Sequence, residues 1–351
     1  MATPAKGYAA PSAKAPLEPY SFKRRAVGPK DVSIKIAYCG VCHSDIHQAR
    51  DEWSAGLFPM VPGHEIVGHV TAVGADVKKF KVGDTVGVGC LVDSCRKCEE
   101  CKKGLEQYCS EGNTWTYNAR TRDGKEITQG GYSDHIVTDE DFVVRVPSNL
   151  DLAAAAPLLC AGITTYSPLR HWGVKAGTKV GVVGLGGLGH MAVKIAKAMG
   201  ADVTVFTTTE NKLESAKKLG ADHVIISKDP KQMEAAKGTL NYILDTVGAP
   251  HDLSPYILAL KTDGVHTLVG IPEGNHPPVP PFPLILGRKS IAGSLVGGIA
   301  ETQEMLDFCG KHGIVSEIEK IKIDYINTAY ERVIKSDVKY RFVIDMASLK
   351  Q

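Results

Sequence analysis

The sequence predicts an α/β protein of two domains, one a doubly wound parallel sheet and the other rich in β-strands. Three observations support this fold class. The chain has 351 residues, more than one hydrophobic core usually organises. Glycine-punctuated strands dominate its first part. After Gly177, short strands alternate with helical stretches.

The first part of the chain carries three clear strand signals. Val32–Ala37 alternates apolar and polar residues, as a half-buried strand does. Ile66–Val70 and Thr85–Val88 are short β-branched runs in a glycine-rich stretch. At Pro147–Asp151 a proline, a serine and an asparagine precede an alanine-rich stretch, and we place a domain boundary there.

Five short apolar runs in the second part have the composition of fully buried strands. Helical stretches separate most of them, which predicts a parallel sheet covered on both faces. The runs are Val180–Val183, Val203–Phe206, Val224–Ile226, Tyr242–Leu244 and Val265–Val269. After them, His276–Pro283 contains five prolines and is expected to be an extended connector.

Composition and charge exclude several kinds of partner. The net charge is +2, from 41 basic and 39 acidic side chains, so nothing favours binding to nucleic acid or to an anionic membrane. No stretch has the form of a signal peptide or of a bilayer-spanning helix. Nine cysteines without an export signal indicate a reducing compartment and metal binding. We therefore expect a cytoplasmic protein with no membrane partner.

Four cysteines lie within fifteen residues, with the spacing C-x2-C-x2-C-x7-C. They are Cys95, Cys98, Cys101 and Cys109. One loop can bring these sulfurs around a single ion, and tetrahedral Zn²⁺ with four thiolates is the usual occupant of such a site. An iron–sulfur cluster and four reduced thiols are the alternatives. Because the protein supplies all four ligands, this zinc would hold the loop over residues 90–110 and leave no position for a substrate.

A nucleotide site is predicted directly after the first strand of the parallel sheet. The run Gly184-Leu185-Gly186-Gly187-Leu188-Gly189 has the G-x-G-x-x-G pattern and lies between a strand and an amphipathic helix, as a Rossmann dinucleotide site requires. Gly184 permits the tight turn, Gly186 lets the backbone approach a pyrophosphate, and Gly189 lets helix and strand pack closely. The helix N-terminus offers free N–H groups to the phosphates.

The residues at the end of the second strand distinguish the two nicotinamide cofactors. An NAD site usually has Asp or Glu there, which binds the ribose 2′-hydroxyl. This chain has Thr207, Thr208 and Thr209, with Lys212 one turn further on. Hydroxyls and an ammonium can hold a 2′-phosphate, which a carboxylate would repel, so we expect NADP(H). Alternatively the threonines only cap a helix, and the nearby Glu210 weakens the case for a phosphate.

A second metal site is suggested by residues that lie far apart in the sequence. The set consists of Cys42, His64, Glu65 and Cys160. Each is unremarkable alone, because a single Cys or His is usually a packed core residue. Together they supply two thiolates and one imidazole, the ligand set that leaves zinc a fourth position for water or substrate. Spacing alone does not show that these residues converge.

The motifs around these residues resemble those of the zinc-dependent medium-chain alcohol dehydrogenases. The resemblance runs from about Tyr8 to Asp345 and rests on GVCHSD at 40–45, GHEIVGHV at 63–70, the cysteine run and the nucleotide loop. Within that family the chain is most similar to the cinnamyl-alcohol-dehydrogenase branch and its bacterial NADPH-dependent aldehyde reductases, through QGGYS, CAGITTYSPL, GLGGLGHMAVKIAKAMGA and DVKYRFVID. It implies a GroES-like catalytic domain over 1–151 and 291–351 and a Rossmann NADP(H)-binding domain over 152–290.

The resemblance also implies roles for individual residues of the second metal set. It assigns the catalytic zinc to Cys42, His64 and Cys160. Glu65 matches a residue that can ligate zinc when water or substrate is displaced. Asp45 matches the carboxylate that orients the histidine ligand.

Further roles around the substrate and the cofactor follow from the same resemblance. Ser44 matches the hydroxyl that touches the substrate oxygen, and His47 the surface end of a proton relay. The residues implied to line the nicotinamide half of the cofactor are Thr164, Gly270, Ser294, Leu295 and Val296. Trp115 and Leu295 are implied to line the substrate pocket. The plant cinnamyl enzymes have an aromatic residue in the segment around Leu295, which argues against lignin precursors as substrates.

The function implied is reversible hydride transfer, in which NADPH reduces an aldehyde to a primary alcohol. Two zinc ions per chain, a broad aldehyde range that includes aromatic aldehydes, and a homodimer formed near Gly287–Ser294 belong to the same resemblance. The rival functions are a polyol or secondary-alcohol dehydrogenase of the same superfamily and a non-catalytic NADPH-binding protein. Cys39, Cys90 and Cys309 match no ligand position and are expected to be buried and inert.

Overall fold

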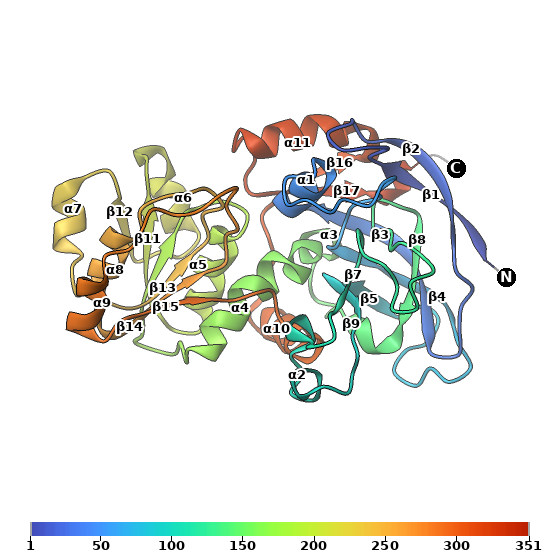
Figure 1. Ribbon diagram of the computed structural model, residues 1–351, viewed down its shortest axis with the longest axis horizontal. Helices are drawn as coiled ribbons and strands as arrows, with labels where there is room; N and C mark the ends of the chain where they lie inside the picture. Colours follow the sequence, from blue (N-terminus) through green and yellow to red (C-terminus); the bar gives the residue numbers. More distant parts are fainter. Residues whose placement is uncertain (1, 350–351) are drawn as a thin grey trace. The chain divides into compact units, whose positions relative to one another are not determined.

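The computed structural model describes residues 2–349 and divides the chain into two compact units (Figure 1). Unit 1 runs from the N-terminus to Ile163 and resumes at Gly297, and unit 2 is Thr164–Val296. The sequence places these boundaries earlier, at 151/152 and 290/291. The alanine-rich segment after residue 151 belongs to unit 1 because its helix α3 (Leu152–Ala155) is buried against strands β3 and β4 of that unit.

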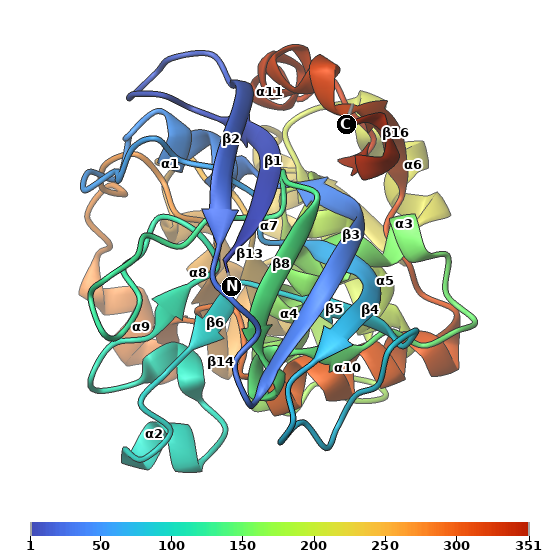
Figure 2. The ribbon, with the colours of Figure 1, turned by 90° about the vertical axis from the view of Figure 1, so that its right-hand side faces the viewer.

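Within the described residues, unit 1 is built on a seven-stranded sheet with the order β16-β17-β3-β4-β5-β9 and with β8 paired to β3. Figure 2 shows β8, β3 and β4 side by side. The strands are β3 (Asp31–Val41), β4 (Ile66–Val73), β5 (Thr85–Val88), β8 (His135–Asp139), β9 (Val144–Arg145), β16 (Ile318–Lys322) and β17 (Arg341–Asp345). All pairs except β16–β17 are antiparallel. The three strands predicted from the first part of the chain are confirmed in β3, β4 and β5.

Two smaller antiparallel pairs and several helices complete unit 1. The hairpin β1 (Thr3–Ala9) and β2 (Glu18–Arg24) lies at the N-terminal end of the chain, and β6 (Leu91–Asp93) pairs with β7 (Thr114–Trp115) at the two ends of the cysteine loop. The other helices of this unit are α1 (His43–Ala49), α2 (Glu99–Lys102), α10 (Ile299–His312) and α11 (Ile326–Ile334). The helix α4 (Ala161–His171) begins in unit 1 and continues into unit 2.

Unit 2, which is described throughout, contains a six-stranded parallel sheet with the order β12-β11-β10-β13-β14-β15. The strands are β10 (Lys179–Val183), β11 (Asp202–Thr207), β12 (His223–Ile226), β13 (Leu240–Asp245), β14 (Leu260–Leu268) and β15 (Ser290–Gly293). The chain builds outward from β10 to β12 and then returns to start again at β13 beside β10. This reversal defines a doubly wound sheet, and ligands of such sheets bind at the reversal point.

Four of the helices of unit 2 connect or cover these strands. They are α5 (Gly189–Ala198), α6 (Leu213–Lys218), α7 (Pro230–Ala235) and α8 (Ser254–Ala259). The five predicted strands of this part are confirmed, with only Val269 falling one residue beyond β14.

The expected extended connector over His276–Pro283 is wrong at its C-terminal end, where helix α9 (Pro281–Gly287) begins. Pro281 and Pro283 lie in the first turn of this helix, where backbone N–H groups have no intrahelical partner. A proline there costs no hydrogen bond, and its fixed φ suits a helix start. The extended conformation therefore ends at Pro280.

Candidate active site and metal centres

Four side chains from distant parts of the sequence meet in the interior of unit 1. Their ligand atoms all lie within 4.8 Å of one another, and all four residues are buried; they are Cys42, His64, Glu65 and Cys160. Cys42 is the N-cap residue of α1, His64 and Glu65 precede β4, and Cys160 follows a short 3-10 helix. The pairing of β3 with β4, extended by a hydrogen bond from Gly40 N to Glu65 O, brings the first two segments together.

The distances within this cluster fit a zinc ion. The sulfurs of Cys42 and Cys160 lie 3.7 Å apart, whereas a disulfide would need about 2.0 Å. A tetrahedral ion with Zn–S bonds of about 2.3 Å places two sulfurs about 3.8 Å apart. A hydrogen bond from the Cys160 thiol lowers the pKa of Cys42, which favours the thiolate that zinc binds. The donor set therefore fits a zinc site with one imidazole and two thiolates.

A buried carboxylate orients the histidine of this cluster. Asp45 is fully buried, and its Oδ1 accepts hydrogen bonds from His64 Nδ1 at 3.0 Å and from Gly63 N at 3.2 Å. Its Oδ2 accepts from Cys42 N at 2.9 Å and from the Tyr132 hydroxyl at 3.1 Å. Because Nδ1 of His64 is engaged, Nε2 is left as the ligand atom. Asp45 was predicted through the GVCHSD motif, whereas the only sequence signal of Tyr132 is its place in QGGYS.

Glu65 of the cluster forms a buried ion pair with Arg341. Arg341 Nη1 is 3.3 Å from Glu65 Oε1 and donates to Val41 O at 3.2 Å. Burial raises the pKa of Glu65 to about 7, while the Arg341 charge opposes that rise. Glu65 can thus be shared between the arginine and a metal ion. Arg341 was also missed as a site residue, although DVKYRFVID had marked its segment.

The two residues expected to move protons lie on α1. Ser44 Oγ is 3.7 Å from Cys42 Sγ. The His47 ring stacks between His43 and Trp53, with both centroid distances 4.7 Å, and its Nδ1 pairs with Glu52 Oε2. His47 therefore has a fixed orientation and one ring nitrogen engaged. No motif of the sequence indicates a role for Glu52.

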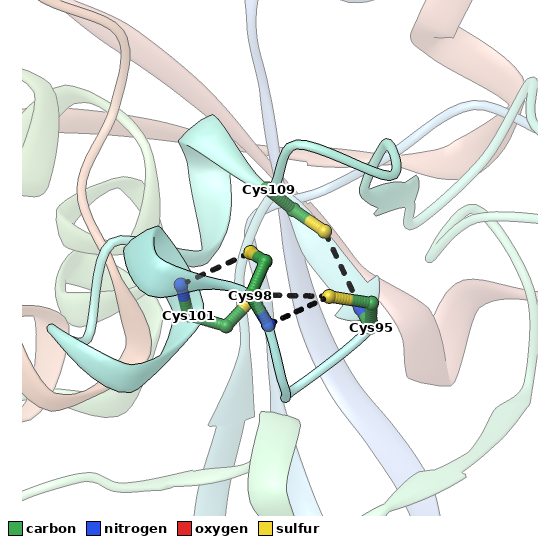
Figure 3. Close-up of side chains that lie close together, drawn as sticks. All are labelled: Cys95, Cys98, Cys101 and Cys109. Atoms are coloured by element: carbon green, nitrogen blue, oxygen red, sulfur yellow. Dashed lines mark hydrogen bonds between the residues drawn. The ribbon is translucent and has the colours of Figure 1, made fainter.

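The cysteine loop forms a separate cluster (Figure 3). The sulfurs of Cys95, Cys98, Cys101 and Cys109 lie within 4.8 Å of one another, and those of Cys95 and Cys101 are 3.9 Å apart. Backbone N–H groups donate to three of the sulfurs, from Cys98 to Cys95, from Cys101 to Cys98 and from Cys95 to Cys109, at 3.3 to 3.4 Å. The N–H groups of Cys101 and Ser110 lower the pKa of Cys98 to about 5. Thiolates stabilised in this way, at tetrahedral spacing, fit a closed zinc site.

One of the three unassigned cysteines departs from expectation. Cys39 and Cys309 are buried, as expected, but Cys90 is only partly buried. A hydrogen bond with Cys160 lowers the pKa of Cys90, so the thiol lies beside the Cys42–Cys160 cluster and is more ionisable than an inert core cysteine. Cys90 lies two residues after the end of β5, and its thiol is 3.9 Å from the carbonyl oxygen of Leu159, the residue before Cys160.

The nucleotide loop of unit 2 has the shape expected of a pyrophosphate site. Gly184 has φ of +88°, so it makes the tight turn after β10. A Cβ atom on Gly189 would overlap the Gly184 carbonyl oxygen, so helix and strand pack as closely as predicted. A Cβ on Gly186 would meet no atom of the described residues within 4 Å, which leaves that backbone open to a ligand.

The threonines at the end of β11 give no side-chain cap to the 3-10 helix that follows. Thr207 is buried at the end of the strand, and Thr208 and Thr209 are exposed. Thr209 is the N-cap residue of a short 3-10 helix, but its hydroxyl donates to Asn211 Oδ1 at 2.5 Å and caps no backbone group. The alternative explanation of the threonines as helix caps therefore loses its support.

The remaining predicted residues are distributed as follows. Thr164 and Val296 are the first and last residues of unit 2, Ser294 N donates to Leu268 O at 3.1 Å, and Gly270 follows β14. A Cβ on Gly270 would overlap the Val247 carbonyl oxygen, in the loop after β13. In unit 1, Trp115 lies opposite Leu91 in the β6–β7 pair, and Tyr117, two residues further on, stacks on the His64 ring at 5.8 Å.

Comparison with known proteins identifies the family. Residues 28–148 match the alcohol dehydrogenase GroES-like domain, and residues 187–311 match the zinc-binding dehydrogenase domain. The aldehyde reductase YahK of Escherichia coli is 58% identical over 345 residues, which cover 98% of this chain and 99% of that protein. The chain belongs to the zinc-dependent medium-chain alcohol dehydrogenases.

Solved structures of this alcohol dehydrogenase family agree in fold. A cinnamyl alcohol dehydrogenase from Sorghum bicolor has a TM-score of 0.95 and 50% identity, with 98% of each chain covered. A cinnamyl alcohol dehydrogenase from Helicobacter pylori, solved in complex with NADP(H), has a TM-score of 0.92 and 48% identity, with 99% of each chain covered. These matches confirm the predicted family, fold class, enzyme class and cofactors of this alcohol dehydrogenase.

Proposed function

We propose that this alcohol dehydrogenase is an NADPH-dependent aldehyde reductase that reversibly converts aldehydes to primary alcohols. The observation that carries the proposal is the buried cluster of Cys42, His64 and Cys160, with its two sulfurs 3.7 Å apart. Zinc held there would polarise a carbonyl oxygen, and NADPH bound to unit 2 would supply the hydride. The name of the Escherichia coli relative supports the substrate class.

The chain's own residues would supply binding and proton transfer. Ser44, whose hydroxyl lies 3.7 Å from Cys42 Sγ, would hydrogen-bond to the substrate oxygen and protonate it as the alcohol forms. His47, held by Glu52 and by the stacked rings of His43 and Trp53, would replace that proton from solvent. Asp45 would keep Nε2 of the histidine ligand directed at the metal.

The proposed cofactor contacts all lie in unit 2. The hydroxyls of Thr208 and Thr209 and the ammonium of Lys212 would bind the 2′-phosphate of NADPH, and the Gly184–Gly189 loop its pyrophosphate. Thr164, Gly270 and the segment Ser294–Val296 would line the nicotinamide. Replacing Lys212 by Ala should raise KM for NADPH about fivefold to tenfold and leave KM for NADH unchanged, because only the phosphate contact is lost.

The experiment that tests the proposal measures initial rates with enzyme of known zinc content. Benzaldehyde, a short aliphatic aldehyde and fructose are each offered with NADPH and with NADH. Fast reduction of both aldehydes with NADPH supports the proposal. Faster reduction of fructose would indicate a polyol dehydrogenase, and no turnover by a two-zinc enzyme would leave a non-catalytic NADPH-binding protein. Preference for NADH would overturn the cofactor assignment alone.

We also propose that the protein is a homodimer formed through the edge of the unit 2 sheet. Strand β15 is the last strand of that sheet, so one of its edges is unpaired. Helix α9, just before it, exposes Phe282, Ile285 and Leu286 to 66%, 73% and 71%. Antiparallel pairing of two β15 edges would cover these side chains with their copies. Light scattering should give a dimer, and the double variant I285E/L286E should give a monomer.

A cytoplasmic location is proposed on the cysteines. All nine are free thiols in the structure, two sets of which are arranged for metal binding. No single helix of residues 2–349 is long and apolar enough to cross a bilayer, although Leu152–Leu159 and Ala161–His171 pass that test when taken together as a bent pair. Fractionation of cells that express a tagged chain would test the location.

A further inference from the structure

The stretch between the third and fourth cysteines of the loop contacts a helix that lies far along the sequence. Glu106 begins the 3-10 helix η1 (Glu106–Tyr108), and its Oε2 accepts the backbone N–H of Ile299, 193 positions away, at 3.0 Å. Ile299 is the first residue of α10, and the N-cap position is Gly298, which has no side chain to cap the helix. Glu106 therefore supplies the cap, with a carboxylate where the helix N–H groups lack partners.

The two backbones approach closely beside this cap. A Cβ atom on Gly298 would overlap the Gly104 carbonyl oxygen and would lie 2.6 Å from Glu106 Oε2, so only glycine fits at position 298. The loop and the helix therefore interlock at two adjacent points, the Gly104–Gly298 approach and the Glu106–Ile299 hydrogen bond. Both points belong to unit 1.

The cysteine cluster holds the capping residue from both sides. Cys101 lies five positions before Glu106 and Cys109 three positions after it, and both cysteines are buried. A metal ion bound to the four thiolates would tie the two ends of this short stretch to one point. Loss of the ion would free both ends of the stretch. An ion bound in the loop would therefore fix the position of Glu106.

The chain just before this contact has a strained backbone. Val296 has φ of +36°, a region that β-branched residues rarely adopt, and a Cβ on Gly297 would lie 2.6 Å from Ile163 Cδ1. Strain of this kind persists where the surroundings fix both flanks, and it concentrates at functional sites. On one flank Ser294 N donates to Leu268 O, and on the other Ile299 N donates to Glu106.

We propose that the zinc loop positions the segment Ser294–Val296 for the cofactor by capping α10 through Glu106. Glu106 is a positioning residue, because it acts through its contact with the first residue of α10. The inference rests on the proposed function in one respect, the contact of Ser294–Val296 with the nicotinamide of NADPH. On this proposal the closed zinc site supports cofactor binding and takes no direct part in hydride transfer.

Other contacts of α10 indicate what loss of the cap would do. In the middle of the helix, Gln303 Oε1 accepts from Arg145 N at 2.7 Å, and near its end Asn149 Nδ2 donates to Gly310 O at 2.8 Å. These contacts would hold the rest of the helix in place. Loss of Glu106 would therefore release the first turn and the strained junction before it, without detaching α10.

The test measures NADPH binding by fluorescence titration of zinc-replete enzyme in four forms: the natural chain, E106A, E106Q and E99A. In E106A we expect Kd for NADPH to rise about fivefold to tenfold, a tenfold rise being about 1.4 kcal/mol. In E106Q the rise should stay below about twofold, since the amide oxygen still accepts from Ile299 N. E99A is the matched control in the same loop, because Glu99 is exposed and, among residues 2–349, its carboxylate pairs with the loop's own Lys103. All four forms should contain two zinc ions per chain.

Two results of the titration would overturn the inference. One is an E106A protein with full zinc and the natural Kd for NADPH. The other is an E99A protein weakened as much as E106A, since that would reflect general softening of the loop. Should E106A fail to fold, hydrogen exchange of the amides of residues 299–302 in the natural chain takes its place: faster exchange after a chelator removes the loop zinc supports the cap, and unchanged exchange rejects it. Tight NADPH binding without aldehyde reduction would count against the proposed function alone.

Discussion

The two metal centres of unit 1 share sulfur donors but are assembled in different ways. The loop cluster gathers four cysteines from one stretch of fifteen residues, and backbone N–H groups of the same loop donate to its sulfurs. The other cluster joins Cys42 to Cys160, 118 positions apart, and all four of its residues are buried. Its ligands are oriented by side chains, chiefly the carboxylate of Asp45.

This difference shows how the sequence encodes a closed metal site and an open one. The loop site satisfies an ion completely with local groups, so a short sequence pattern is enough to encode it. The open site must leave one position free and still hold its ligands, so it needs a rigid surrounding built from several elements. The β3–β4 pairing, α1 and the QGGYS loop each contribute one part of that surrounding.

The largest effect is expected when a ligand of the open site is removed. Replacing Cys160 by Ser should lower kcat/KM for aldehyde reduction about a thousandfold or more, because the Lewis acid is worth several kcal/mol to the reaction. Zinc content should fall from two ions to one per chain, with the loop zinc retained. C309S is the matched control, since Cys309 is buried and its sulfur lies beside Met305. A C160S protein that kept both zinc ions and its activity would remove the basis for the open site.

Breaking the loop site should lower stability and weaken NADPH binding, and it should leave the zinc-assisted chemistry of the open site intact. Replacing Cys98 by Ser should lower the free energy of unfolding by about 3 kcal/mol or more, and Tm by about 10 °C, because binding of a structural ion contributes directly to folding. Calorimetry measures the change, and zinc analysis should show the open site still filled. An unchanged Tm after loss of the loop zinc would mean that the ion does not hold this part of unit 1.

The same contrast explains how much of the molecule could be predicted from sequence. The loop site was complete in the spacing of its four cysteines, and the strands of the parallel sheet followed from short apolar runs between helical stretches. Both are local patterns. The convergence of Cys42 and Cys160 depends on strand pairing across unit 1, and only the family resemblance indicated it.

The residues that sequence analysis missed are those whose role depends on a distant partner. Tyr132 reaches Asp45, Arg341 reaches Glu65, and Glu106 reaches Ile299, each across more than 80 positions. A tyrosine, an arginine or a glutamate gives no local signal of such a contact. The motifs QGGYS and DVKYRFVID contain Tyr132 and Arg341, but they do not indicate which atoms these side chains contact.

A smaller effect is expected at the hydroxyl that supports the open site. Replacing Tyr132 by Phe removes one donor from the buried Asp45 carboxylate, at a cost of about 1 to 2 kcal/mol. We expect a chelator to extract the open-site zinc about tenfold faster, while release of the loop zinc keeps its rate. Y242F, a buried tyrosine of unit 2, serves as the control. Equal acceleration at both sites would show that the substitution softens the whole unit rather than the Asp45 network.

The smallest effect is expected at Glu52, which we expect to assist proton delivery at the open site. The closed site has no position for a substrate and needs no proton transfer. Aldehyde reduction at the open site requires a proton for the product, and His47 is the residue proposed to supply it from solvent. Glu52 pairs with His47 Nδ1 and so determines which ring nitrogen faces the rest of the path. E52Q keeps the size of the side chain but loses its charge, and we expect kcat to fall about threefold to tenfold with zinc content, Tm and Kd for NADPH unchanged. The solvent deuterium isotope effect on kcat should rise, since proton delivery becomes slower than hydride transfer.

E331Q, which removes a carboxylate paired with Arg50 at the surface, is the control. A fall in kcat without a larger isotope effect would mean that Glu52 supports the fold around Trp53 and has no part in proton delivery.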